Sequence, residues 1–398
     1  MQKVETDFLV IGAGIIGLVF AKRLKEVFTD AKIIIIDKEN DVALHASSRN
    51  SGVLHAGFYY SPDSLKAKLT KDGNLYWKDY CLKNHLPYKN TQKVVVTKNE
   101  DELKTLWELY QRGNKNQVPL KLIDEKELKE IEPKAKTFQR ALYSPLTGNV
   151  DPKKISFHLK EELSKTSVLF LFSEPYITRR KDQVITKNYQ IKSRFIINAA
   201  GLYADRIAKG FGVGKDYTIL PFKGLYLEAE NQNFFRTNIY PVPDLNFPFL
   251  GVHFTITIDD KIKIGPTAIP AFWREQYSGF ENFRFGELLK ILYHGSSLFL
   301  RSSFEFRSFA AEEIKKYNRS YLLKKAMMLV SEIPERKFRW GKAGIRAQLL
   351  NKKTLQLVND FVVEQEENSI HVLNAVSPAF TAAYPFAKYV IEKYIRIY

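Results

Sequence analysis

The stretch DFLVIGAGIIGLVFAKRLKEVFTDAKIIIID, residues 7–37, decides the fold of this chain. The apolar run Phe8–Ile11 predicts a short buried strand, and a helix is expected from Gly14 to about Val27. The β-branched run Ile33–Ile36 predicts a second strand, of the kind that is buried on both faces of a parallel sheet. These elements together predict a strand–helix–strand unit with parallel strands.

Three glycines between the first strand and the helix have the spacing G-x-G-x-x-G. Gly12 permits a tight turn, Gly14 lets the backbone approach a pyrophosphate, and Gly17 lets the helix pack closely on the strand. The N–H groups at the start of the helix attract phosphate. Asp37 ends the second strand, where a carboxylate can accept hydrogen bonds from a ribose diol. The segment therefore predicts a dinucleotide site.

The bulk composition limits the other possibilities. At roughly 150 residues per domain, a chain of 398 residues is expected to form two or three domains. Its one cysteine, Cys81, excludes an intrachain disulfide and the cysteine clusters of zinc and iron–sulfur sites. The histidines show no metal-ligand spacing, so no metal is expected.

The formal net charge of +17 favours acidic partners: an anionic substrate, anionic lipid or nucleic acid. The basic residues are scattered, and no nucleic-acid-binding module is recognisable, so no nucleic-acid partner is expected. The longest apolar stretch, Phe8–Ala21, is too short to span a bilayer and lacks the basic start of a signal peptide. We therefore expect a cytoplasmic protein that can contact the cytoplasmic face of a membrane peripherally.

The remaining chain alternates between strand and helix patterns. Helices are expected from Ser61 to Asn84, after Asn99, after Asp124 and from Asp151. The segment Pro221–Pro266 is rich in aromatic and β-branched residues, which predicts an antiparallel sheet. Helical patterns follow from about Gly286 to Glu332, strands return near Ala343, and a helix from Pro378 closes the chain.

This order predicts an α/β protein, α+β overall, in which an antiparallel-sheet substrate domain is inserted into a Rossmann-like domain. We assign residues 1–88, 141–220 and 341–398 to the nucleotide-binding domain. Residues 89–140 and 221–340 are assigned to the substrate domain.

A second motif distinguishes FAD from NAD. Residues 45–57 read HASSRNSGVLHAG, a polar segment rich in small residues that follows the second strand. Small residues allow the backbone to contact a flavin ring or ribityl chain, and the hydroxyl and amide side chains can donate hydrogen bonds. The segment therefore predicts FAD.

Here the sequence resembles a known family. The segments Asn50–Val53, His55–Gly57 and Tyr59–Lys66 are similar to the L-2-hydroxyglutarate oxidase/dehydrogenase family of the FAD-dependent D-amino-acid-oxidase superfamily. The resemblance continues in the segments Asn198–Asp205, Pro221–Gly224, Gly344–Gln348 and Asn374–Ala379. The sequence departs from the family at Arg49, where histidine is more frequent, at Lys223, where arginine is usual, and at Val376, where proline is usual.

The resemblance and the two motifs together give a set of residues expected to bind FAD. These are Gly12, Gly14, Ile16, Gly17, Asp37, Lys38, Ser48, Arg49, Asn50, Ser51, Gly52, Ala200, Gly201, Gly344, Ser377, Pro378 and Ala379.

The resemblance implies oxidation of a 2-hydroxy acid, most specifically L-2-hydroxyglutarate to 2-oxoglutarate, with hydride passing to the flavin and electrons to quinone or oxygen. The hydroxyl proton needs a base, and histidine has a suitable pKa, which makes His55 and His253 the candidates. Arg346 is the candidate for the C1 carboxylate, because a guanidinium binds carboxylate through two parallel hydrogen bonds.

Lys223, Tyr59 and Tyr60 are candidates for the distal carboxylate, although both tyrosines suit a hydrophobic core equally well. Other reactions on the same scaffold stay open at this point: oxidation of an amino acid or of glycerol 3-phosphate. A more distant alternative, supported only by the charge of +17, is an FAD-folded protein that binds or modifies RNA.

Overall fold

The computed structural model describes residues 1–245, 249–301, 303–333 and 335–395. The chain forms two compact units. Unit 1 contains Met1–Arg49, Pro152–Leu220 and Arg346–Tyr398, and unit 2 contains Asn50–Asp151 and Pro221–Ile345. The division differs from the boundaries expected above mainly at residues 50–88 and 141–151, which belong to unit 2. The chain enters each unit more than once, as the discontinuous domains of the sequence analysis do.

Unit 1 is built on an eight-stranded sheet whose main path runs β10-β11-β12-β1-β2-β9, with β23 beside β12 and β22 beside β23. The parallel strands are β1 (Gln2–Ile11), β2 (Ile33–Ile36), β9 (Val168–Leu171), β12 (Tyr189–Asn198) and β23 (Ser369–Asn374). The antiparallel strands are β10 (Thr178–Arg180), β11 (Gln183–Ile185) and β22 (Val362–Glu366). All four residues of β2 are buried, as a strand covered on both faces requires.

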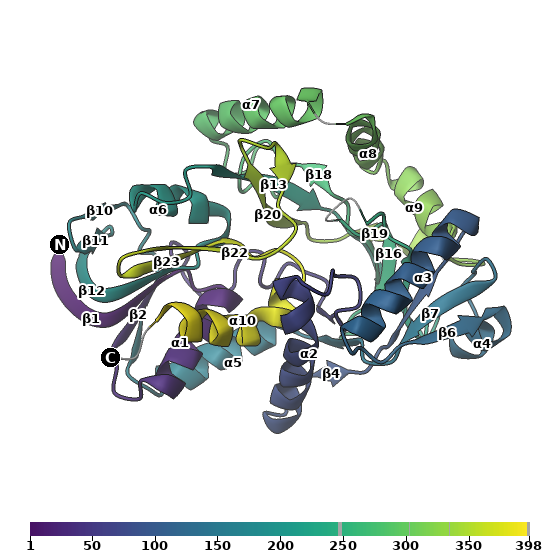
Figure 1. The fold of residues 1–398 in the computed structure, drawn as a ribbon, viewed down its shortest axis with the longest axis horizontal. Helices are drawn as coiled ribbons and strands as arrows, with labels where there is room; N and C mark the ends of the chain where they lie inside the picture. Colours follow the sequence, from purple (N-terminus) through teal and green to yellow (C-terminus); the bar gives the residue numbers. More distant parts are fainter. Residues whose placement is uncertain (246–248, 302, 334, 396–398) are drawn as a thin grey trace. The chain divides into compact units, whose positions relative to one another are not determined.

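The helices of unit 1 are α1 (Ile15–Val27), α5 (Pro152–Ser164), α6 (Ala204–Gly210) and α10 (Ala379–Tyr394), with a short 3₁₀ turn at Gly201–Tyr203. Helix α1 packs against α10 and α5, and the three lie together in Figure 1. Strands β1 and β2 contribute Leu9, Ile11, Ile34 and Ile36 to the core of the unit. The strand–helix–strand unit predicted from residues 7–37 is thus confirmed.

Unit 2 contains a second eight-stranded sheet, in the order β19-β14-β17-β16-β15-β5-β7-β6. Its strands are β5 (Lys93–Val96), β6 (Lys121–Asp124), β7 (Arg140–Ser144), β14 (Leu227–Glu230), β15 (Asn238–Pro241), β16 (His253–Ile256), β17 (Lys261–Gly265) and β19 (Arg339–Trp340). Neighbouring strands are antiparallel, as predicted, except that β15 runs parallel to β5. No hairpin joins these two strands, so no short loop imposes an antiparallel direction on them.

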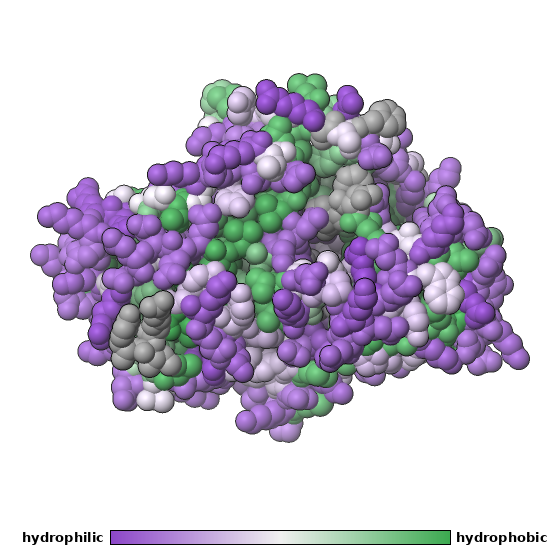
Figure 2. Space-filling model, viewed as in Figure 1, coloured by the Kyte–Doolittle hydropathy of each residue, from purple (hydrophilic) through white to green (hydrophobic). Residues whose placement is uncertain are grey.

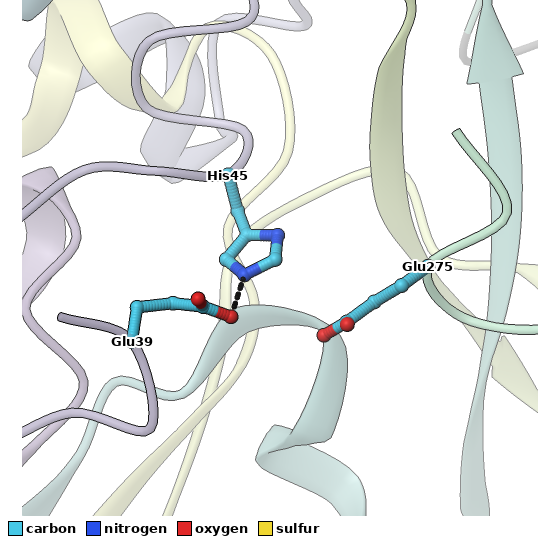
Figure 3. Close-up of side chains that lie close together, drawn as sticks. All are labelled: Glu39, His45 and Glu275. Carbon is cyan, nitrogen blue, oxygen red and sulfur yellow. Dashed lines mark hydrogen bonds and ion pairs between the residues drawn. The ribbon is translucent and has the colours of Figure 1, made fainter. Parts of the chain in front are cut away.

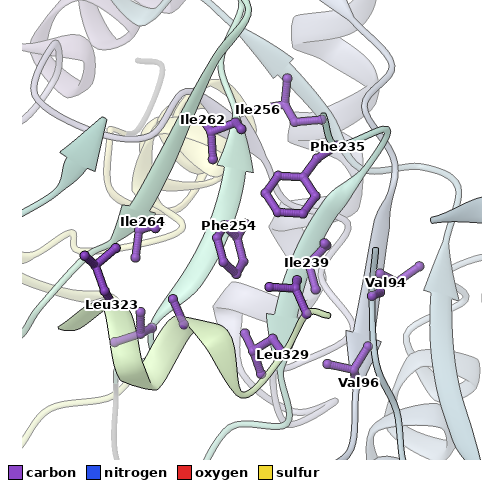
Figure 4. Close-up of a cluster of buried hydrophobic side chains, with 14 of the residues drawn as sticks. Val94, Val96, Phe235, Ile239, Phe254, Ile256, Ile262, Ile264, Leu323 and Leu329 are labelled. Atoms are coloured by element: carbon purple, nitrogen blue, oxygen red, sulfur yellow. The ribbon is translucent and has the colours of Figure 1, made fainter. Parts of the chain in front are cut away.

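The two faces of this sheet pack into different hydrophobic clusters. One face carries Val94, Val96, Ile239 and Phe254 into the cluster drawn in Figure 4. Because successive side chains of a strand point to opposite faces, Val95 and Tyr240 belong to the other cluster, with Phe58 and Tyr59. The buried polar residues of this sheet that are described below lie on its second face.

Unit 2 also contains a small sheet, β3-β8-β4, made of β3 (Val53–Leu54), β8 (Gly148–Val150) and β4 (Tyr88–Lys89). Its first helices are α2 (Leu65–Lys83), α3 (Glu100–Lys115) and α4 (Glu125–Ile131). The predicted caps at Asn99 and Asp124 are confirmed, since their side chains accept hydrogen bonds from the N–H groups of Glu102 and Glu127. The expected helix start at Ser61 was too early: Ser64 caps α2 by accepting from Ala67 N–H.

A four-stranded sheet has the order β18-β13-β20-β21. Its strands are β18 (Ile269–Pro270), β13 (Tyr217–Gly224), β20 (Gly344–Asn351) and β21 (Gln356–Leu357). The remaining helices of unit 2 are α7 (Phe285–Arg301), α8 (Phe304–Lys315) and α9 (Arg319–Met327), with a 3₁₀ turn at Glu335–Lys337. In the part of the chain that the structure describes, no helix has the length and apolar character needed to cross a bilayer.

Candidate functional site

The glycine loop of unit 1 has no room for a side chain at Gly12 or at Gly17. Gly12 has φ +111°, and a Cβ there would lie 2.6 Å from the carbonyl oxygen of Ala199. A Cβ on Gly17 would lie 1.9 Å from the carbonyl oxygen of Gly12. Strand β1, the loop and helix α1 can therefore pack in this way only with glycine at both positions. Such a backbone cradle at a helix N-terminus fits a pyrophosphate.

The Asp37 carboxylate holds the same loop from the end of β2. Its oxygens accept hydrogen bonds from Ala13 N–H at 2.7 Å and from Glu39 N–H at 2.9 Å. Each carboxylate oxygen has a second lone pair for a ribose hydroxyl. Burial raises the pKa of Asp37, while the two backbone hydrogen bonds act in the opposite direction. Asp37 is thus fixed against the glycine loop by Ala13 N–H and against the residues after β2 by Glu39 N–H.

Two residues outside the set of predicted FAD contacts fix neighbouring backbone segments of unit 1. Ser47 Oγ accepts a hydrogen bond from Ile15 N–H at 2.9 Å, at the first residue of α1. Asn198, at the end of β12, accepts from Ala200 N–H at 3.2 Å and donates to the Ala204 carbonyl at 2.9 Å. A polar residue at the end of a buried apolar run is the sequence signal that identifies Asn198.

A group of polar side chains follows β2 in the sequence. His45 Nε2 lies 2.9 Å from Glu39 Oε1 and 2.9 Å from Lys38 Nζ, and Figure 3 shows the hydrogen bond between His45 and Glu39. Lys38 is also paired with Glu39. Ser48 donates to the Ala43 carbonyl at 2.5 Å, and Arg49 Nε donates to the Leu44 carbonyl at 3.1 Å. These bonds fix the first half of the 45–57 segment.

The predicted site residues divide between the two units. Those in unit 1 are Gly12, Gly14, Ile16, Gly17, Asp37, Lys38, Ser48, Arg49, Ala200, Gly201, Arg346, Ser377, Pro378 and Ala379. Those in unit 2 are Asn50, Ser51, Gly52, His55, Tyr59, Tyr60, Lys223, His253 and Gly344.

Unit 2 brings the two candidate bases together with a tyrosine. His253 stacks on Tyr240, with ring centroids 3.7 Å apart and planes inclined by 15°. Both His55 and His253 are buried. Burial holds the pKa of His55 well below its ordinary value, and the nearby charges of Lys93, His253 and Lys66 lower it further. A neutral imidazole is the form that can accept a proton.

The tautomer of His253 follows from one hydrogen bond. Its Nδ1 lies 2.8 Å from the Gly251 carbonyl oxygen. A carbonyl can only accept, so Nδ1 carries the hydrogen, and Nε2 is the basic nitrogen of the neutral ring.

The expected carboxylate-binding residues lie in several elements. Tyr59 packs in the second hydrophobic cluster, and burial raises the pKa values of both Tyr59 and Tyr60. Lys223 is a buried residue of β13, and burial lowers its pKa. Arg346 is a half-buried residue of β20.

Lys93 was not among the residues predicted from the sequence. This residue begins β5, is fully buried, and places its Nζ 4.0 Å from the ring centroid of Tyr240. The available signal was a lysine at the head of the apolar run Val94–Val96, an unusual start for a strand whose residues are all buried.

The chain is similar to known proteins over almost its whole length. The family described as FAD dependent oxidoreductase matches residues 7–393. The L-2-hydroxyglutarate dehydrogenase, mitochondrial, of Homo sapiens is 35% identical over 95% of this chain and 86% of its own length. The protein of the same name from Caenorhabditis briggsae is 34% identical over 98% and 93%. The L-2-hydroxyglutarate dehydrogenase of an Escherichia coli strain is 32% identical over 97% and 92%.

Solved structures share the fold at lower identity. The L-alpha-glycerophosphate oxidase of Mycoplasma pneumoniae with FAD bound has a TM-score of 0.76 at 22% identity, over 98% of this chain and 94% of that one. The glycine oxidase of Geobacillus kaustophilus has a TM-score of 0.71 at 15% identity, with coverage of 98% and 94%. These likenesses confirm the predicted fold class. The chain belongs to the FAD-dependent oxidoreductase family, and the three relatives named above are L-2-hydroxyglutarate dehydrogenases.

Proposed function

We propose that this flavoenzyme oxidises L-2-hydroxyglutarate to 2-oxoglutarate. The names of relatives similar over nearly the whole chain support the substrate. The observation that carries the chemistry is the buried group of two histidines and a lysine in unit 2, which offers a base and positive charge to an anionic hydroxy acid. When bound, FAD supplies the acceptor for the hydride that leaves C2.

The residues proposed to hold FAD are the set predicted from the sequence, with Ser47 added as a support of the start of α1 and Asn198 as a support of the turn after β12. The glycine cradle and the Asp37 carboxylate support the ADP half of this assignment. The proposals for residues 50–52, Gly344 and Ser377–Ala379 rest on the resemblance.

One histidine is proposed to accept the proton of the substrate hydroxyl. The fixed tautomer of His253, with a basic Nε2, supports this residue. The place of His55 in the glycine-rich segment supports His55, and its lowered pKa keeps the ring in the neutral form that can accept a proton. Burial assists either histidine, because it excludes the water that would otherwise compete for the proton.

Arg346 is proposed to bind the C1 carboxylate, and Lys223, Tyr59 and Tyr60 the distal carboxylate. A guanidinium fixes the orientation of a carboxylate through two hydrogen bonds, and orientation accounts for much of the rate of a positioned reaction. The Tyr59 hydroxyl is buried and has no hydrogen-bond partner among the described residues, which supports a ligand at that position.

Replacement of Arg346 by alanine is expected to lower kcat/KM for L-2-hydroxyglutarate by roughly 100-fold while FAD stays bound. Arg346→Lys, which keeps the charge and loses the planar fork, is expected to recover only part of the rate. Steady-state kinetics and the flavin spectrum measure both effects. Arg194→Ala removes an exposed arginine of the same unit and serves as the control. Unchanged kinetics in Arg346→Ala would remove this residue from the site.

We also propose that the electron acceptor is quinone and that the protein reaches it by peripheral contact with an anionic membrane. The exposed face of α7 supports this contact. Its apolar residues follow helical spacing and lie on one face: Phe285, Leu289, Leu292, Tyr293, Phe299 and Leu300. Tyr293 and Leu300 are 70% and 72% exposed, and Figure 2 shows hydrophobic side chains over α7 at the top of the view. The net charge of +17 favours anionic lipid.

The triple change Phe285→Ser, Leu289→Ser and Leu300→Ser is expected to weaken vesicle binding by about tenfold or more, because it removes exposed apolar area from one helix face. Sedimentation with phosphatidylglycerol-containing vesicles measures this binding, with phosphatidylcholine vesicles for comparison. Turnover with a soluble dye should not change. Equal sedimentation of the variant and the parent protein would exclude this face as the contact.

A further inference from the structure

Lys93 is the first residue of β5, in the eight-stranded sheet of unit 2. Along β5, Val94 and Val96 pack in the cluster of Figure 4, whereas Val95 packs with Tyr59 and Tyr240 on the opposite face. By strand alternation, Lys93 shares the face of Val95. Its side chain is completely buried there.

The ammonium group of Lys93 contacts aromatic rings. Nζ lies 4.0 Å from the ring centroid of Tyr240, 5.2 Å from that of Tyr59 and 5.7 Å from that of Phe58. Ring faces attract a cation, but they do not satisfy three N–H donors. Among the described residues, Nζ has no hydrogen-bond partner. Burial accordingly lowers the pKa of Lys93 to about 7. A buried ammonium in such surroundings lacks an acceptor, and preferably an anionic one.

The charged side chains near the Lys93 ammonium group are positive. Lys93, His253 and Lys66 all lower the pKa of His55, so four basic side chains lie near one another. The Tyr59 hydroxyl is a further donor without a hydrogen-bond partner among the described residues. Another buried lysine of unit 2, Lys316, is by contrast paired with Glu313. The region around Lys93 thus offers donors and positive charge, which a bound carboxylate would complement.

We propose that Lys93 binds a carboxylate of the hydroxy-acid substrate and that the Tyr59 hydroxyl is its neighbouring donor, an inference that rests on the proposed function. The substrate then supplies the counter-charge that the described protein residues do not. Lys93 adds to the binding residues predicted from the sequence. A bound carboxylate accounts for the burial of this lysine among aromatic rings.

The test compares Lys93→Met, which keeps the length of the side chain and removes the charge, with the FAD-loaded parent protein. Glutarate is the probe, because it carries both carboxylates and has no hydroxyl to oxidise. Isothermal titration calorimetry is expected to show glutarate binding weakened by about 100-fold in Lys93→Met, since a buried charge pair has lost one partner. Lys121→Met, an exposed lysine of the same sheet, is the matched control and should bind normally.

Kinetics with two substrates shows which of the two substrate carboxylates Lys93 binds. If Lys93 binds the distal group, Lys93→Met loses kcat/KM for L-2-hydroxyglutarate but not for L-2-hydroxybutyrate. If it binds C1, both substrates lose by the same factor. Either result supports the proposal. Glutarate binding and kinetics like those of the parent protein in Lys93→Met would overturn it.

A second measurement does not depend on the folding of a variant. A crystal structure of the parent protein with glutarate should place a carboxylate oxygen within about 3.2 Å of Lys93 Nζ. Glutarate bound elsewhere would overturn the proposal even if every Lys93 variant failed to fold. Failure of the proposed function looks different, because the parent protein would then neither bind glutarate nor oxidise L-2-hydroxyglutarate.

Discussion

Replacement of Gly17 by alanine is expected to give a protein that retains almost no FAD. The added Cβ would lie 1.9 Å from the Gly12 carbonyl oxygen, a backbone atom that cannot rotate away. Either α1 must move from β1 or the loop must open, and both changes distort the cradle for the pyrophosphate. FAD affinity should fall by about 100-fold or more, because overpacking alone costs roughly 1–3 kcal/mol and the distorted loop also loses its phosphate contacts.

Flavin absorbance of the purified protein and a fluorescence titration with FAD measure this loss. Gly286→Ala is the matched control, because a Cβ at Gly286 meets no atom within 4 Å. A yellow Gly17→Ala protein with full flavin content would contradict the assignment of the loop.

The second large effect is expected from the histidines of unit 2. Replacement of the histidine that accepts the hydroxyl proton by glutamine should lower kcat by about 10²–10⁴-fold, because the glutamine amide is not a base near neutral pH. Replacement of the other histidine should lower kcat less. His55→Gln and His253→Gln are therefore compared for kcat, flavin content and glutarate affinity. Retained flavin and glutarate binding with lost turnover identifies the base, and near-normal turnover in both variants would exclude both.

The pH dependence gives a separate test of His55. Its pKa lies well below the ordinary value of 6.5, so the ring stays neutral as the pH falls through that value. If His55 is the base, the acid limb of kcat/KM should lie below pH 6.5, and it should disappear in His55→Gln. An acid limb above 6.5 that His55→Gln leaves unchanged would point to another group.

The features that the sequence predicted correctly are mostly local. The glycine loop, the strands around it and the caps at Asn99 and Asp124 depend on residues within one turn or one short loop. The start of α2 was misplaced because Ser61 and Ser64 are both acceptable caps, and Ser64 is the one whose side chain accepts from Ala67 N–H.

The features that it missed depend on long-range pairing. Lys93 meets Tyr240 only because β5 lies parallel to β15, and no local pattern specifies that neighbour. The exposed apolar face of α7 was not predicted from the sequence for a related reason. Its periodicity predicts a helix, but only the packed structure shows that Ile291 and Leu298 are buried while Leu289 and Leu300 are not.

The central claim is that the chain oxidises L-2-hydroxyglutarate with FAD. Anaerobic bleaching of the bound flavin by a panel of L- and D-2-hydroxy acids, amino acids and glycerol 3-phosphate tests it most directly. We predict rapid bleaching by L-2-hydroxyglutarate, slow or no bleaching by its D enantiomer, and none by the amino acids or glycerol 3-phosphate. Bleaching by an amino acid or by glycerol 3-phosphate, with no response to L-2-hydroxyglutarate, would contradict the claim.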